Sequence, residues 1–101
     1  MSTPHVVTLV IDMPITKLDA LDTIAFLADG EVEGAGTVAP VVWLSPDTWA
    51  QVEIPKFADP PPIAIDVCSE KSAASARFQA GRLAAALERV GWTVRPERPL
   101  A

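Results

Sequence analysis

Short apolar stretches rich in β-branched residues recur along the chain and predict the strands of a sheet. The first, HVVTLVIDM at 5–13, is bounded by prolines on both sides, and its length and apolarity suit a central strand. The segment EVEGAG at 31–36 is predicted to be a loop, and PKFADPPP at 55–62 a connector, because proline cannot pair within a central strand. The remaining predicted strands are TVAPVVWL at 37–44, WAQVEI at 49–54, IAIDVC at 63–68 and WTVRP at 92–96.

Two segments have the hydrophobic period of amphipathic helices. Thr16 with Asp19 three residues later resembles a capping box and starts a helix that ends near Asp29, closed by Gly30. Residues 69–91 predict one long second helix. The apolar face of the first helix comprises Leu18, Leu21, Ile24, Ala25 and Ala28. The core stripe of the second comprises Ala76, Ala80, Leu83, Leu87 and Val90.

The tetrapeptide SPDT at 45–48 allows two interpretations. Pro46 and Asp47 suit the two central positions of a type I turn, which would make the flanking strands a hairpin. Alternatively, Ser45 is an N-cap and Pro46 the first residue of a short helix. The pattern leaves both open.

The predicted order β-α-β-β-β-α-β is the split βαβ plan of a ferredoxin-like sandwich with one strand added. Right-handed crossovers then place both helices on one face of a mostly antiparallel sheet. The length of 101 residues suits a single small α/β domain, 1–101, with residues 94–101 as a frayed C-terminal tail.

Alternation along the predicted strands divides their side chains between the two faces of the sheet. The face toward the helices is expected to carry Val7, Leu9, Ile11, Met13, Val41, Trp43, Ala50, Val52, Ile54, Ile63, Ile65 and Val67. The open face is expected to carry Val6, Thr8, Val10, Asp12, Val42, Leu44, Trp49, Gln51, Ala64, Asp66 and Cys68. That open face is apolar enough to predict a homodimer.

The second helix also has an unusual band on the side away from its core stripe, formed by Ala74, Phe78, Gly81 and Ala85. Arg82 and Arg89 flank this band on one side. An aromatic ring among small residues is typical of a contact surface, and Gly81 lowers helix stability by roughly 1 kcal/mol relative to alanine. Two other interpretations remain: scattered exposed residues without a role, or packing of Phe78 against Phe26 of the first helix.

Charge and cysteine content restrict the classes of function. Residues 1–66 carry ten acidic and two basic side chains, and the whole chain has a net charge of −5. An acidic chain repels phosphate backbones, so nucleic-acid binding is disfavoured. Cys68 is the sole cysteine, which excludes an internal disulfide and favours a cytoplasmic setting. No membrane segment and no cofactor motif is expected.

Few residues offer catalytic chemistry. His5 is the sole histidine, and nothing in the pattern places a base beside Cys68, which we interpret as a buried, inert thiol. Asp12 and Asp66, with Glu70 nearby, share the expected open face and would be close enough to hold a divalent cation if their strands are neighbours. Asp12 in LVIDM resembles the strand-end aspartate of CRISPR-associated nucleases of ferredoxin-like fold. The resemblance covers the first strand alone and implies a metal-dependent nuclease as the alternative function.

The main hypothesis is a non-enzymatic protein–protein interaction module, a small regulatory or accessory protein of the kind that phages and mobile elements encode to bind a host protein. Its expected partner is another protein, or a second copy of the chain. The residues expected to bind the partner are Ala74, Phe78, Gly81, Arg82, Ala85 and Arg89 of the second helix, with Leu44 and Trp49 of the open sheet face.

Overall fold

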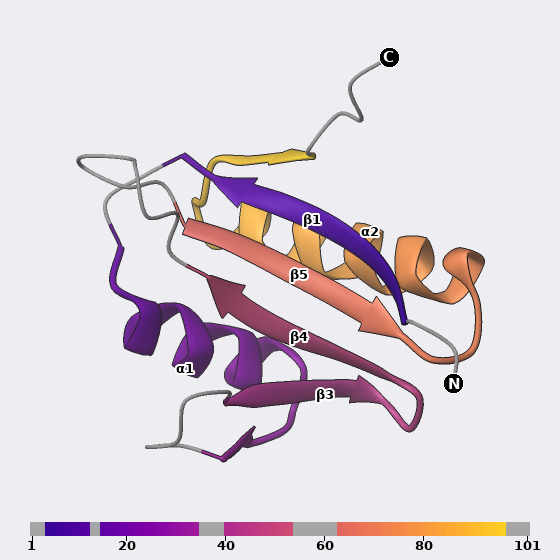
Figure 1. Ribbon diagram of the computed structural model, residues 1–101. Coiled ribbons are helices and arrows are strands. Elements are labelled where there is room, and N and C mark those ends of the chain that lie inside the picture. Colours follow the sequence, from indigo (N-terminus) through magenta and orange to yellow (C-terminus); the bar gives the residue numbers. More distant parts are fainter. Residues whose placement is uncertain (1–3, 13–14, 35–39, 54–62, 97–101) are drawn as a thin grey trace.

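The computed structural model is an α+β fold in which one antiparallel sheet carries two helices (Figure 1). It describes residues 4–12, 15–34, 40–53 and 63–96. The six strands lie in the order β2-β3-β4-β5-β1-β6. The elements are β1 (His5–Ile11), α1 (Lys17–Leu27), β2 (Val32–Glu33), β3 (Val41–Ser45), β4 (Thr48–Glu53), β5 (Ile63–Ser69), α2 (Ala73–Arg89) and β6 (Val94–Pro96).

Helix α1 begins as the sequence predicts. The side-chain oxygen of Thr16 accepts a hydrogen bond from the backbone N–H of Asp19 at 3.1 Å, which satisfies one of the unpaired donors of the first turn. At the other end the N–H of Gly30 donates to the carbonyl of Ala25 at 2.9 Å. The left-handed residue of this cap is Asp29, with φ of 56°, so the residue before the glycine reverses the chain.

Helix α2 is shorter at its start than the expected 69–91. Ser69 still belongs to β5 and is fully buried, and its hydroxyl oxygen accepts from the backbone N–H of Lys71 at 3.1 Å. Ser72 is the N-cap, and its hydroxyl oxygen accepts from the N–H of Ser75 at 3.0 Å. The serines therefore hold the turn between strand and helix before the first helical residue, Ala73.

The last turn of α2 explains why Val90 leaves the core stripe. The helix ends at Arg89, and Gly91 adopts φ of 94°. The N–H of Trp92 then donates to the carbonyl of Leu87 at 3.0 Å, a bond that closes the helix end. Val90 is the C-cap and 51% exposed, so the prediction that it is a core residue is wrong.

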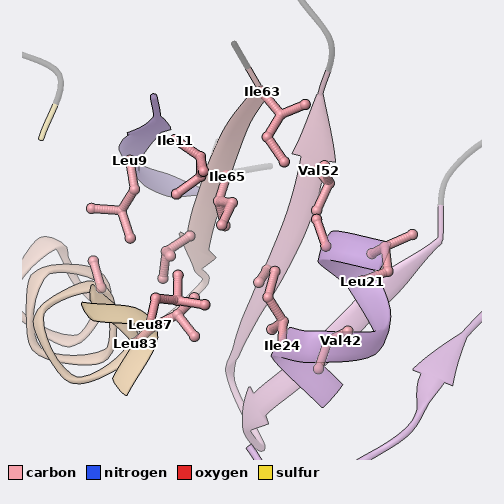
Figure 2. Close-up of a cluster of buried hydrophobic side chains, with 14 of the residues drawn as sticks. Leu9, Ile11, Leu21, Ile24, Val42, Val52, Ile63, Ile65, Leu83 and Leu87 are labelled. Carbon is pink, nitrogen blue, oxygen red and sulfur yellow. The ribbon is translucent and has the colours of Figure 1, made fainter. Parts of the chain in front are cut away.

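One hydrophobic core joins both helices to the same face of the sheet (Figure 2). The expected stripe of α2 is confirmed from Ala76 to Leu87. On α1 the expected face shifts, because Leu18 is 72% exposed and Ala20 is fully buried in its place. The core residues are Leu9, Ile11, Ala20, Leu21, Ile24, Ala25, Val42, Ala50, Val52, Ile63, Ile65, Val67, Ala80, Leu83 and Leu87.

The segment around SPDT is a hairpin, so the short-helix interpretation is wrong. Strands β3 and β4 pair antiparallel, with Ser45 opposite Thr48 across the turn. The next paired residues are Trp43 and Trp49, which leaves Leu44 unpaired at a β-bulge. One extra residue on β3 therefore separates the turn from the rest of the ladder.

This bulge exchanges the two faces of β3 relative to the expectation. Val42 pairs with Ala50 and both are fully buried in the core, whereas Val41 and Trp43 point to the open face with Trp49. Because side chains alternate along a strand, a shift of one residue moves every side chain to the other face. The prediction that Val42 and Leu44 lie on the open face is therefore wrong; Leu44 packs against the helix-side core.

The edges of the sheet also differ from the expected plan. Val32 and Glu33 form β2, pairing with β3 within a segment predicted to be a loop. At the other edge β6 pairs with Leu9–Ile11, so the prediction of a frayed tail is wrong for residues 94–96. Several predictions fall outside the described residues: Met13, residues 37–39 of the strand predicted at 37–44, Ile54, the predicted connector 55–62, and residues 97–101 of the predicted tail. Within the described ranges, neither helix has the length and apolarity needed to cross a membrane.

Candidate functional site

The outer face of α2 presents the band that the sequence singled out. Ala74, Phe78, Gly81 and Ala85 are all exposed, and the ring of Phe78 is 63% exposed. A Cβ atom added to Gly81 would meet nothing within 4 Å. Glycine weakens a helix relative to alanine, and packing within the described residues does not require glycine at this position.

Phe78 does not pack against Phe26. Both rings are exposed, Phe26 by 83%, so the interpretation that they cover each other is wrong. The neighbour of Phe78 is instead Arg82, whose guanidinium carbon lies 5.8 Å from the centroid of the ring. A cation at that distance is attracted to the face of the ring but leaves most of the ring open to a partner.

On its other side Phe78 borders a cavity of about 330 Å³ between the start of α2 and the tip of the β3–β4 hairpin. The cavity is lined by Ser45, Pro46, Asp47, Thr48, Lys71, Ser75, Phe78 and Gln79. The band on α2 is thus continuous with the hairpin tip.

Hydrogen bonds centred on Asp47 hold that tip in place. One of its carboxylate oxygens accepts from the hydroxyls of Thr48 at 2.9 Å and Ser45 at 3.0 Å. These two bonds, with the nearby charge of Lys71, hold the pKa of Asp47 below its usual value. The backbone carbonyl of Asp47 also accepts from the N–H of Glu70 at 3.0 Å, which ties the hairpin to the segment before α2.

A second hollow, the α1–α2 groove, has a volume of about 340 Å³. It brings together four residues predicted for the site: Leu44, Arg82, Ala85 and Arg89. Leu44 reaches it because of the β-bulge, so this residue joins the helix-side surface and not the open sheet face. The remaining lining residues are Leu27, Ala28, Gln79, Leu83 and Ala86.

Leucine and alanine side chains give the α1–α2 groove apolar walls, and both of its charged lining residues are cationic. Arg82 and Arg89 are exposed and form no ion pair with any residue that the structure describes. Such a groove suits an apolar side chain carried beside a carboxylate. The contribution of Leu27 and Ala28 was not predicted, because the helix period assigned Ala28 to the core and gave no signal that α1 ends beside α2.

The open sheet face is organised by a tryptophan pair. The ring centroids of Trp43 and Trp49 are 5.2 Å apart with planes inclined by 55°. Trp43 remains 40% exposed and Trp49 is half-buried. Trp49, a predicted site residue, is thus on the opposite side of the molecule from the other seven.

Cys68 lies directly opposite Trp49 in the sheet and is only 4% exposed. Burial, aided by the charge of Asp66, raises the pKa of its thiol to about 11. A thiol that stays protonated at neutral pH is a poor nucleophile. The predicted burial of Cys68 is confirmed.

The two aspartates of the nuclease hypothesis are not brought together. Strands β1 and β5 are neighbours, but Asp66 pairs with Thr8, whose hydroxyl donates to its carboxylate at 2.7 Å. Asp12 lies four residues further along, about 13 Å away at the usual rise per residue, and pairs with Arg95 at 3.6 Å. The prediction that they are close enough to share a cation is therefore wrong. In the described ranges no group of three His, Cys, Asp or Glu residues is arranged to hold a metal.

No protein-family model matches the chain, and neither the curated proteins nor the solved structures provide a match. The functional interpretation therefore depends on the geometry of the surface.

Proposed function

We propose that the protein is a non-enzymatic protein–protein interaction module that binds its partner through the outer face of α2. The observation that carries this proposal is the exposed ring of Phe78, held beside Arg82 and next to the open strip at Gly81. Aromatic and arginine side chains are the commonest energetic anchors of protein interfaces.

The surroundings of the ring support the same role. The hairpin tip is fixed by the hydrogen bonds of Asp47, and the α1–α2 groove adds apolar walls on the other side. A surface that is ordered before binding loses less conformational entropy when the partner arrives.

We also propose that the fold is a ferredoxin-like split βαβ sandwich extended at one edge. The four strands β4, β5, β1 and β6 are consecutive in the sheet, and β1 lies between β5 and β6, the two strands that α2 connects. Strands β2 and β3 would then be the addition. The free, buried thiol of Cys68 is compatible with action in a reducing compartment, the cytoplasm.

Affinity capture from an extract of the source organism tests the proposed function. The tagged wild-type chain should retain a protein that Phe78→Asp does not retain. Val6→Asp is the matched control, because Val6 is 51% exposed and lies on the opposite sheet face. Equal retention by wild type and Phe78→Asp would reject α2 as the binding surface.

A further inference from the structure

The two helices form a surface layer with opposite exposed charges. The exposed acids Asp22 and Asp29 lie on α1 and in its C-terminal cap, and Arg82 and Arg89 lie on α2. None of these four side chains forms an ion pair with the residues that the structure describes. The layer therefore carries unpaired charges of both signs in separate places, which suits a partner with the reverse arrangement.

Large apolar side chains are exposed on the same layer. Among the described residues, Leu18, Phe26, Phe78 and Val90 are more than half exposed on the helix side, compared with Val6 alone on the open sheet face. Leu18, Asp22 and Phe26 follow one another at intervals of four residues, so they share one side of α1. This side of α1 combines apolar side chains with a carboxylate. The α1–α2 groove combines apolar walls with two arginines.

We propose that the partner of this layer is a second copy of the chain, with α1 of each copy lying across α2 of the other. The proposal rests on the proposed function and names the partner of its binding surface. A two-fold axis parallel to the helices makes both contacts equivalent, as a closed homodimer requires. Phe26 of one copy then reaches the α1–α2 groove of the other.

The spacing of the charges fits this arrangement. Arg82 and Arg89 are seven residues apart on α2, which is about two helical turns. Asp22 lies on α1, and Asp29 directly follows the C-cap residue Ala28 at the end of that helix. The two helices run in opposite directions across the sheet (Figure 1). Asp22 therefore lies opposite Arg89 of the second copy, and Asp29 lies opposite Arg82. The apolar side chains between these pairs are covered in the same contact.

The open sheet face is less suited to a second copy. Asp66 stands among its central residues, bonded to Thr8, and Arg95 is already paired with Asp12. In the described part of this face no unpaired cation is left to meet Asp66. Stacking two such faces brings carboxylates toward each other without compensation.

Sedimentation equilibrium of the full chain over a concentration series tests the inference. The wild type should show twice the mass of one 10.7 kDa chain. Asp22→Arg and Arg89→Asp should each raise the dissociation constant roughly tenfold or more, because each places like charges together. The double variant Asp22→Arg/Arg89→Asp should restore the dimer, since the pair is re-formed with exchanged signs. Arg77→Asp is the matched control on α2 and should leave the constant unchanged.

Circular dichroism of each variant separates a weakened interface from a lost fold, and Asp22→Arg leaves α2 unaltered. A wild type that stays monomeric throughout the series would overturn the inference. So would a dimer that Val6→Asp dissociates while Arg89→Asp does not, because the interface would then be the open sheet face. Neither result decides the proposed function, which is read separately from whether Phe78→Asp loses the protein that the wild type captures, be it the untagged chain itself or another protein.

Discussion

The guanidinium of Arg82 lies over the ring of Phe78, 5.8 Å from its centroid, on the solvent side of α2. The two residues are four positions apart and are therefore neighbours on one helix face. A cation–π contact at an exposed site contributes about 0.5–1 kcal/mol, enough to favour one orientation of the ring. The ring of Phe78 is thus in contact with Arg82 but remains mostly exposed.

Truncating Phe78 should barely change the stability of the fold. Phe78→Ala removes a ring that is 63% exposed, so the free energy of unfolding should fall by no more than about 1 kcal/mol. Leu83→Ala is the control on the same helix: it removes a side chain that is 5% exposed and should cost about 2 to 5 kcal/mol. Urea unfolding of both variants measures the difference, and similar losses would mean that Phe78 belongs to the core.

The two glycines of the α2 region should respond oppositely to alanine. Gly81→Ala should raise the free energy of unfolding by roughly 0.5 to 1 kcal/mol, because the added Cβ meets nothing within 4 Å. Gly91→Ala should lower it by roughly 1 to 2 kcal/mol, because φ of 94° is strained for a residue with a side chain. Thermal melts of the pair provide the comparison; a loss of stability in Gly81→Ala would show that the position is packed.

The β-bulge at Leu44 predicts which valine of β3 supports the core. Val42 is fully buried, so Val42→Ala should destabilise the fold by about 2 kcal/mol. Val41 lies half-buried on the open face, and Val41→Ala should cost less than about 1 kcal/mol. The reverse ranking in denaturant unfolding would mean that the hairpin pairs without the bulge.

The thiol of Cys68 should make stability depend on pH in the alkaline range. Burial raises its pKa from 9.0 to about 11, so the folded state keeps the proton at pH values where the unfolded chain loses it. Between these values the folded state binds more protons, and stability falls as pH rises. Cys68→Ala should remove this component of the fall when unfolding is measured across the window. An unchanged slope in that variant would show that other groups cause the whole dependence.

Patterns among residues close together in the sequence were enough to predict the helix cap and the buried stripe of α2. The cap at Thr16 depends on residues three apart, and the burial of Leu83 and Leu87 follows from the helical period. The same period identified Phe78 as a residue on the outer face. These features required no knowledge of which strand pairs with which.

Strand register was the part that the sequence did not reveal. The bulge at Leu44 depends on how β3 meets β4, and it moves Val42 into the core and Leu44 beside α2. The distance between Asp12 and Asp66 likewise depends on the pairing of Asp66 with Thr8. A slip of two residues keeps every side chain on its face, and a bulge changes the pairing without any change in the alternation of either strand, so alternation alone cannot select the register.

The central claim is that the outer face of α2 binds the partner. Partner capture by the variant Gly81→Leu tests this claim most directly. Leucine favours the helix more than glycine does and enters open space, so the variant should unfold at a higher midpoint than the wild type. Its side chain would nevertheless fill the small-residue strip beside Phe78. If the outer face of α2 is the binding surface, this better-folded variant should fail to retain the protein that the wild type captures. Full retention of that protein by Gly81→Leu would contradict the account.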